Sequence, residues 1–545
     1  MRIVLLLLIL LPWSVHAADR TVEAAGVIRE WTDGRVGKPV ANVLVSNGVE
    51  VVRTDRRGRY RIHLSAQQTV FVIKPAAYAA VVDGSQGERF WRHYFPEGSP
   101  PLRYAGIEVT RGRVSQLDFF LRPRLTTIAA SGLEVLVFGD PQPKTATQVD
   151  YYLRDIIEPI AAGVAGSKRA ESDNDSSAHR VSVADLGLTL GDVVHDDLSL
   201  LPLIKQATAR LGVSWLYAPG NHDIDFDAQS DEDSLLSYRH VFGPDTLAWE
   251  EPQASFIMLD DVIYQPLQTP TYIGGLRESQ FTFLAAYLAT LDPSKRLVIG
   301  AHIPFFDPDP AQPSFRQADR ERLFALLAKF QNVLLLTAHG HVQRHYFHAE
   351  KDGWLGAQPL HEYNVGATCG GFWTGAKDAY GIPDALMNDG TPNGYATLLI
   401  AEDGSYGLRW HVARDPDHSG IALHAPRVLR RGAWPEVGLY ANVFMGTDDS
   451  VVEFRIDDGG WQPMQRVERA DPRLLAINLA DDAAAQPISD ERAPEAGISA
   501  HLWRVFLPTD LAAGEHRVEV RSVDRWRGEL RATTRYRLVE PAQAN

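Results

Sequence analysis

Five short segments of this chain carry side chains that can bind divalent metal ions. In chain order they are Asp140, Gly191-Asp192, Gly220-Asn221-His222-Asp223, His302 and His339-Gly340-His341. Each segment follows an apolar run that is expected to form a buried strand, as Leu133–Phe138 does before Asp140. Carboxylate, amide and imidazole groups together suit Mn, Zn or Fe ions. The order of these groups predicts a site for two divalent metal ions, with hydrolysis of a phosphate ester as the expected chemistry.

The residue types also predict a division of labour within this site. A two-metal hydrolase needs one carboxylate that bridges the ions, so that they lie ~3.5–4 Å apart and share a hydroxide. Asp192 is the best candidate, because Gly191 before it allows the backbone to approach the ions closely. Asn221 offers an amide oxygen, which leaves the adjacent His222 beside the metals without binding them. His222 is then free either to protonate the leaving oxygen or to stabilise charge in the transition state. Asp223 is a candidate to orient His222 by accepting its other ring proton.

Each of these signals also has a purely structural interpretation. A Gly-Asp pair at the end of a strand is usually a turn, and a single histidine such as His302 is more often a hydrogen-bonded core residue than a ligand. His195, Asp196 and Asp197 follow the predicted bridging aspartate, and the favoured interpretation is a helix N-terminal cap with solvated carboxylates. Taken jointly and in this order, the five segments favour the metal site.

Several other reactive residue types lie near these segments. Phe372 and Trp373 fit either an aromatic wall of the substrate pocket or packing between domains. His345 and His348 are expected to be strand or loop residues and not ligands. The single cysteine, Cys369, excludes an internal disulfide and is expected to be a small buried hydrophobic residue.

Length and composition limit the number of domains and the classes of binding partner. The 545 residues predict two to four domains, and the hydrophobic fraction of 45% is that of a soluble globular protein. The formal net charge of −15 argues against general nucleic-acid binding. It does not argue against a small phosphorylated substrate, because the metal ions supply the local positive charge.

The first residues predict a signal peptide. Arg2 is followed by an apolar run over residues 3–11 and by Val15-His16-Ala17, which fits a cleavage site after residue 17. A retained N-terminal anchor is the less favoured alternative. No later segment approaches the ~20 apolar residues that a membrane-spanning helix needs. We therefore expect an exported protein, either periplasmic or secreted.

The remaining sequence divides into three regions by its pattern. Residues 18–124 contain short β-rich runs and the hairpin signal Asn47-Gly48, which predict a β-sandwich module. Residues 130–350 alternate between strands and helices and predict a layered α/β domain. Residues 360–542 predict a β-rich domain, in which residues 514–524 alternate between polar and apolar side chains.

The series Gly-Asp, Gly-Asn-His-Asp, Ala-His and His-x-His resembles the calcineurin-like metallophosphoesterases. The flanking regions resemble those of a bacterial secreted subgroup, including an N-terminal transthyretin-like module. The resemblance implies a four-layer α/β/β/α core between two β-sandwich-like modules. It also implies two ligand sets, which are Asp140, Asp192 and His341 for the first metal, and Asp192, Asn221, His302 and His339 for the second. His222 would be the catalytic imidazole.

One residue departs from the pattern of this superfamily. Most members have histidine two residues after the first aspartate, whereas this chain has Gln142. Three roles stay open for Gln142, namely a direct ligand, a contact through water, and a residue beside a weakly filled first site. The departure also keeps a second function open. The protein could be a binding protein that has kept the fold without competent metal binding and without turnover.

Overall fold

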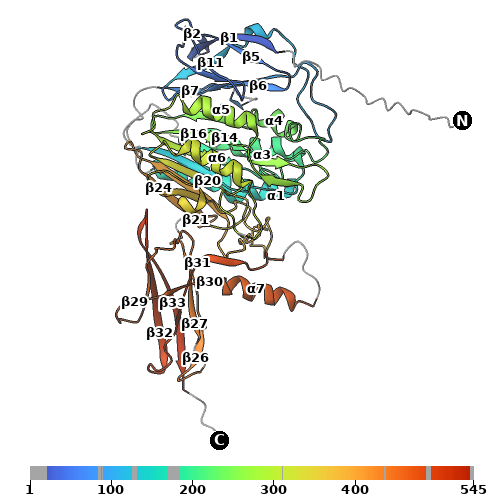
Figure 1. The fold of residues 1–545 in the computed structure, drawn as a ribbon. Helices are drawn as coiled ribbons and strands as arrows, with labels where there is room; N and C mark the ends of the chain where they lie inside the picture. Colours follow the sequence, from blue (N-terminus) through green and yellow to red (C-terminus); the bar gives the residue numbers. More distant parts are fainter. Residues whose placement is uncertain are drawn as a thin grey trace, which may run out of the picture.

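The computed structural model describes residues 21–32, 34–83, 87–88, 90–124, 132–169, 184–309, 311–415, 418–434, 437–485 and 492–540. The expected signal peptide, residues 1–17, lies outside these ranges. Within them, no helix has both the length and the apolar character needed to cross a membrane. The ribbon shows three groups of elements along the chain, from the N-terminal strands to the C-terminal strands (Figure 1).

The N-terminal region forms two larger sheets and a two-stranded sheet of β8 (Val82–Asp83) and β9 (Gly87–Glu88). One has the order β2-β1-β11-β7, with β5 also paired to β1, and the other has the order β10-β6-β3-β4. The strands are β1 (Val22–Thr32), β2 (Arg35–Pro39), β3 (Leu44–Ser46), β4 (Val51–Arg53), β5 (Arg59–Leu64), β6 (Gln68–Ile73), β7 (Tyr78–Ala80), β10 (Trp91–Tyr94) and β11 (Phe119–Pro123). The predicted hairpin at Asn47-Gly48 is confirmed, because β3 and β4 pair in antiparallel register around it.

A five-stranded sheet begins the central region and has the order β14-β13-β12-β23-β24. Its strands are β12 (Leu133–Phe138), β13 (Leu186–Leu190), β14 (Ser214–Ala218), β23 (Gly394–Ile400) and β24 (Tyr406–Val412). The first three are parallel to one another, and β23 runs antiparallel to β12. Every residue of β13 is buried, as expected for a parallel strand that is covered on both faces.

A second central sheet has six strands in the order β15-β16-β19-β20-β22-β21. They are β15 (Leu247–Glu250), β16 (Ala254–Met258), β19 (Arg296–Gly300), β20 (Val333–Thr337), β21 (Arg344–His348) and β22 (Leu360–Asn364). The four inner strands are parallel, so their carboxyl ends lie along one edge of the sheet. Ligands in such α/β folds bind at this edge.

Helices pack against these two sheets, and the central region is mixed α/β as predicted. Helix α1 (Ala146–Tyr152) contacts β12 through Tyr152, whose ring lies 6.2 Å from that of Phe138. Helix α6 (Gln317–Leu327) contacts β21 through Phe324, whose ring lies 4.9 Å from that of His348. The other helices here are α2 (Glu158–Arg169), α3 (Leu201–Thr208), α4 (Leu236–Phe242) and α5 (Glu278–Leu288).

The central sheets continue well beyond residue 350, where the sequence predicts that the α/β domain ends. Strand β22 is an inner strand of the second sheet, and β23 and β24 complete the first. The domain boundary therefore moves to about residue 412. Sequence periodicity identifies a strand but not the strand with which it pairs, which explains the misplaced boundary.

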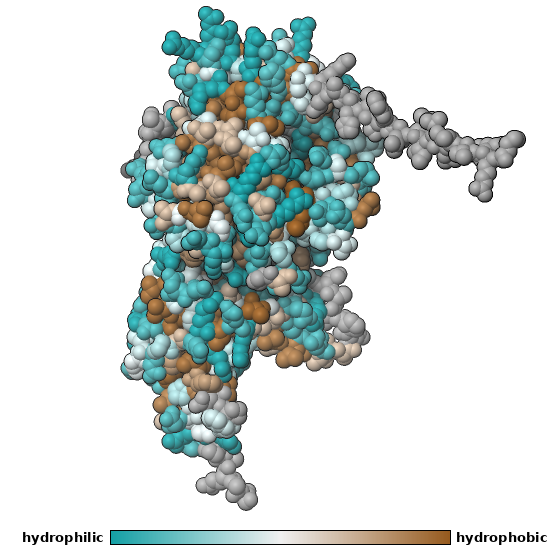
Figure 2. Space-filling model, in the orientation of Figure 1, coloured by the Kyte–Doolittle hydropathy of each residue, from teal (hydrophilic) through white to brown (hydrophobic). Residues whose placement is uncertain are grey.

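The C-terminal region contains two further sheets with a hydrophobic core of their own. The strands are β25 (Ile421–His424), β26 (Val428–Arg430), β27 (Gly438–Val443), β28 (Val452–Ile456), β29 (Gln462–Pro463), β30 (Gln465–Ala470), β31 (Ile498–Phe506), β32 (Gly514–Asp524) and β33 (Gly528–Val539). Helix α7 (Pro472–Asp482) lies beside them. The visible surface of this region is mostly hydrophilic, with apolar side chains in scattered groups (Figure 2).

Candidate metal centre

The strand ends of both central sheets bring the predicted site residues together. Asp140, Asp192 and Asn221 follow the parallel strands β12, β13 and β14 of the first sheet. His302 and the segment 339–341 follow the parallel strands β19 and β20 of the second sheet. The site thus lies where the carboxyl ends of the two sheets meet.

The backbone is strained at several of these positions. Positive φ angles occur at five of them, which are Asp140 (43°), Gln142 (40°), Asp192 (46°), His339 (70°) and His341 (49°). Residues other than glycine rarely adopt such angles, and a structure keeps them only where its other contacts impose them. Strain of this kind concentrates at functional sites, so its presence here supports a functional role.

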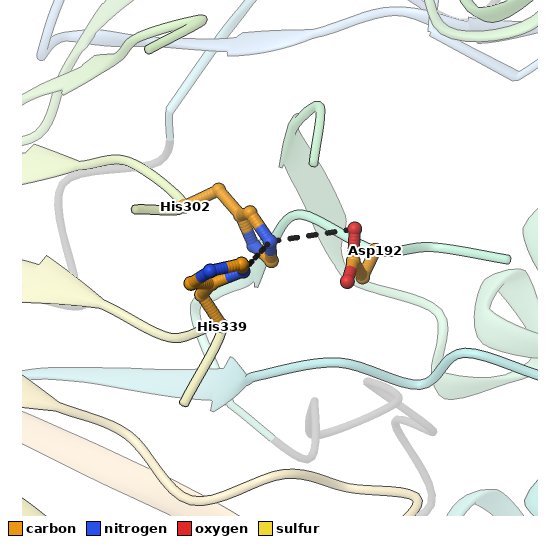
Figure 3. A group of neighbouring side chains, drawn as sticks. All are labelled: Asp192, His302 and His339. Carbon is orange, nitrogen blue, oxygen red and sulfur yellow. Dashed lines mark hydrogen bonds and ion pairs between the residues drawn. The ribbon is translucent and has the colours of Figure 1, made fainter. Parts of the chain in front are cut away.

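Three potential ligand atoms converge on Nε2 of His302. This nitrogen lies 3.1 Å from His339 Nδ1 and 3.3 Å from Asp192 Oδ1 (Figure 3). It also lies 3.0 Å from Asn221 Oδ1. The other ring nitrogen of His302, Nδ1, donates to the carbonyl oxygen of Leu190 at 2.8 Å. Because Nδ1 carries that proton, a neutral His302 directs the lone pair of Nε2 toward this group of atoms.

Such a group of electron-rich atoms needs a cation at its centre. Asp192, His302 and His339 form a group with metal-binding geometry. Without a metal, a proton on His302 must compensate the charge of Asp192. Burial alone would lower the pKa of His302, but the charge of Asp192 raises it to about 10. Burial alone would raise the pKa of Asp192, but His302 holds it well below its usual range. The residues therefore fit a divalent cation, which would replace the proton.

Asp140 and His341 form the other part of the site. His341 Nε2 lies 3.7 Å from Asp140 Oδ1, and its Nδ1 donates to the carbonyl oxygen of Gly370 at 2.7 Å. This hydrogen bond fixes the tautomer and leaves Nε2 free to bind a metal. Burial raises the pKa of Asp140 to about 8, so metal binding here must release a proton near neutral pH.

Gln142 also lies in the site. Its Nε2 donates to Asp192 Oδ2 at 2.8 Å, and its Oε1 lies 3.8 Å from the thiol of Cys369. In this orientation the NH2 group of the amide faces the carboxylate of Asp192, and the amide oxygen faces Cys369. Cys369 is buried, as predicted, and burial raises the pKa of its thiol.

His222 has a different carboxylate partner from the one that the sequence predicts. Its Nδ1 lies 2.7 Å from Asp196 Oδ1, and its ring stacks on that of His195 at 4.2 Å. Burial alone would lower the pKa of His222, but the hydrogen bond to Asp196 and the charge of Asp192 raise it above its ordinary value. The backbone N–H of His222 donates to Asp192 Oδ1 at 2.9 Å, which places the ring beside the metal ligands.

The expectation that Asp223 orients His222 is therefore wrong. The buried carboxylate of Asp223 accepts backbone N–H groups from Val193 (3.0 Å), Val194 (3.1 Å) and Gly220 (2.8 Å). It ties the turn after β13 to the turn after β14, which makes its role structural. Asp196 is the carboxylate partner of His222. Its position shortly after Asp192 was the one indication of this in the sequence, because the contact itself depends on the geometry of the turn.

The replacement Asp223→Asn tests this structural role. Either orientation of the amide directs an NH2 group at a backbone N–H that now donates to the carboxylate. We expect the free energy of unfolding to fall by about 1–3 kcal/mol, as for a buried donor without an acceptor. Denaturant unfolding of the metal-free protein measures this, and an unchanged midpoint would contradict it.

The residues around the site divide into packing and site-facing groups. Trp373 is buried and donates from Nε1 to the carbonyl oxygen of Pro141 at 2.8 Å, so it supports the loop that carries Gln142. The ring of Phe372 lies 4.6 Å from that of His341 and so faces the site.

Asp197 caps the short helix Leu198–Leu200, as predicted, whereas Asp196 does not.

His345 and His348 lie on β21, in agreement with their expected place on a strand. His348 Nε2 lies 2.6 Å from Glu362 Oε2. His345 Nδ1 lies 2.9 Å from Nε2 of His361. These partners account for both residues without a metal.

Two family profiles match this chain, on either side of the segment that carries the metal centre. The profile of the C-terminal region of calcineurin-like phosphoesterases matches residues 362–529, and that of the N-terminal region matches residues 29–101. A search of curated proteins finds no significant match.

Two solved structures show distant similarity. A dimetal phosphatase from Danio rerio is 15% identical with a TM-score of 0.33, over 52% of this chain and 96% of that chain. A purple acid phosphatase from yellow lupin (Lupinus luteus) seeds is 12% identical with a TM-score of 0.37, over 73% of this chain and 67% of that chain. The two family profiles show that residues 29–101 and 362–529 of this chain are similar to the N-terminal and C-terminal regions of calcineurin-like phosphoesterases.

Proposed function

We propose that this protein hydrolyses a small phosphomonoester or phosphodiester at a site for two divalent metal ions. The observation that carries this proposal is the convergence of an amide oxygen, a carboxylate oxygen and an imidazole nitrogen on Nε2 of His302. All four atoms can donate a lone pair to a divalent cation. Mn, Zn and Fe fit this mixture of nitrogen and oxygen donors.

The ligands divide into two sets that share Asp192. Asp140, Asp192 and His341 would hold the first metal, and Gln142 borders this set. Asp192, Asn221, His302 and His339 would hold the second metal. The two metals, when bound, supply the activated water and the positive charge that phosphate-ester hydrolysis needs.

His222 is the proposed general acid. Its Nδ1 is occupied by Asp196, so Nε2 is the nitrogen that carries the transferable proton. Asp196 keeps the ring charged and oriented in the way that a carboxylate stabilises an imidazolium. Proton transfer from Nε2 to the leaving oxygen then avoids the release of an unprotonated alkoxide.

The proposal also covers the architecture of the protein and its location in the cell. The two central sheets and their helices form a four-layer α/β/β/α core over residues 132–412. The flanking pairs of sheets are β-sandwich-like modules, at residues 21–124 and 421–539. The N-terminal pattern of residues 1–17 supports export to the periplasm or secretion.

Metal-dependent turnover tests the proposed function. The full-length protein is treated with chelator, reloaded with Mn²⁺, Zn²⁺ or Fe²⁺, and assayed on nitrophenyl phosphate monoesters and diesters. We expect turnover that depends on the metal, with two ions per chain by elemental analysis. Absence of turnover with every metal, together with absence of bound metal, would instead favour a binding protein.

Gln142 predicts that the two metal sites differ in affinity. The amide can offer one weak oxygen ligand, whereas histidine at this position would offer a nitrogen. We expect mild chelation to empty the first site before the second, and Gln142→His to raise the affinity of the first site for Zn²⁺ or Mn²⁺. Isothermal titration of the metal-free protein measures both affinities. Two equal sites that the replacement leaves unchanged would place Gln142 outside the coordination shell.

A further inference from the structure

The loop that carries His341 is linked, through Asp389, to a residue of the C-terminal sheets. Gln343, two residues after His341, donates its backbone N–H to Asp389 Oδ2 at 2.7 Å. The same carboxylate oxygen lies 3.0 Å from Nε2 of His501 on β31. Gln343, Asp389 and His501 are each 1% exposed, so solvent cannot substitute for these contacts.

The neighbours of His501 present acceptor atoms to both nitrogens of its ring. Asn442 donates from Nδ2 to the carbonyl oxygen of Asp389 at 2.8 Å and to Asp471 Oδ2 at 2.7 Å. Its Oδ1 therefore faces Nδ1 of His501, at 2.7 Å. An amide oxygen and a carboxylate oxygen only accept hydrogen bonds, so each ring nitrogen of His501 faces an acceptor. One of these acceptors is the buried carboxylate of Asp389, and hydrogen bonds to a charged group are the strong ones.

The turn that contains Asp389 is fixed to the C-terminal sheets at further points. Arg473 Nη2 donates to the carbonyl oxygen of Gly390 at 2.8 Å, and Gly497 N–H donates to that of Asn388 at 2.8 Å. Gly390 has a φ of +81°, and a Cβ there would come within 2.5 Å of Asp471 Oδ2. Only glycine fits this close approach, so the turn has little freedom to move.

The loop of His341 needs such support because its backbone is strained. His339 and His341 have φ angles of 70° and 49°, and residues other than glycine keep such angles only where other contacts impose them. Asn364 Nδ2 holds the carbonyl oxygen of Val342 at 2.9 Å, and Asp389 holds the next N–H group along the chain, that of Gln343. These two contacts fix the end of the loop just beyond His341.

We propose that His501 is a positioning residue for the first metal site. Through Asp389 it fixes Gln343, and thereby the place of the His341 imidazole opposite Asp140. The C-terminal sheets are then a required part of the metal site and not only an appended module. This inference rests on the proposed role of His341 as a metal ligand.

The replacement His501→Leu removes the hydrogen-bond partner of Asp389 and tests this role. Metal-free full-length protein is titrated with Co²⁺ and followed by visible absorption and calorimetry. We expect the affinity of the first site to fall by about 10- to 100-fold, the usual effect of losing a residue that supports a metal ligand. The second site, built on His302 and His339, should change much less.

Two further variants separate positioning from general destabilisation. His501→Gln keeps a donor near the place of Nε2 and should restore part of the first-site affinity. The matched control is His516→Leu, because His516 forms a similar pair with Asp457, at 2.8 Å, on the same sheets but without a link to the loop. It should leave the first site unchanged even where it lowers the melting temperature.

The outcomes distinguish this inference from the proposed function. First-site affinity that is unchanged in His501→Leu, or that falls equally in His516→Leu, would overturn the positioning role. If His501→Leu does not fold, His501→Gln and Asp389→Asn decide the question, and unchanged first-site affinity in both would overturn it. Failure of the unaltered protein to bind Co²⁺ would instead contradict the proposed function.

Discussion

Replacement of Asp192 by asparagine should abolish hydrolysis and remove both metal ions together. Asp192 is the one carboxylate shared by the two proposed ligand sets, and its oxygens also accept from His222 N–H and Gln142 Nε2. Asparagine keeps the shape but loses the charge, and its NH2 group would face either a backbone donor or a metal ion. Without the bridging carboxylate, the two ions would not be held at the spacing that the reaction needs.

Elemental analysis and steady-state rates of Asp192→Asn measure this effect. The matched control is Asp150→Asn on helix α1, where a half-exposed carboxylate pairs only with Arg154 at the surface. That control should keep two metals and normal turnover. Near-normal turnover in Asp192→Asn would show that another residue bridges the metals.

Replacement of His222 by alanine should separate catalysis from metal binding. We expect both metals to remain and turnover to fall by about 10²–10⁴-fold, the usual contribution of a general acid. The loss should be larger for an alkyl phosphate than for a nitrophenyl phosphate, because a strongly basic leaving oxygen depends more on protonation. Asp196→Asn should show the same preference with a smaller loss, since it keeps the ring but weakens its orientation.

The substrate comparison makes this second prediction specific to an acid. His240→Ala, an exposed histidine at the end of α4, serves as the control and should change neither rate. Loss of one metal ion in His222→Ala would identify His222 as a ligand. An equal loss with both leaving groups would show that His222 stabilises charge but does not transfer the proton.

The sequence predicted the place of the metal centre better than the contacts within it. Asp140, Asp192 and His302 each follow a strongly apolar run, and apolar runs that end in polar residues identify strand ends reliably. Because parallel strands align their carboxyl ends, their meeting in space follows from the fold class. The site could therefore be located from local pattern alone.

The partner of His222 could not be found in this way. Asp223 is adjacent in sequence, but its side chain points into the turns and binds backbone N–H groups. Asp196 reaches the ring only because the chain after β13 turns back at a residue with a positive φ of 60°. The domain boundary was misplaced for a related reason, since the pairing of β22 and β23 with distant strands depends on the whole sheet.

Anomalous diffraction from crystals grown with Mn²⁺ tests the central claim most directly. We predict two peaks ~3.5–4 Å apart that share Asp192, as expected for a two-metal hydrolase. One peak should lie between Asp140 and His341, and the other among Asn221, His302 and His339. A single peak, or peaks outside this group of residues, would contradict the assignment of a two-metal phosphoesterase site.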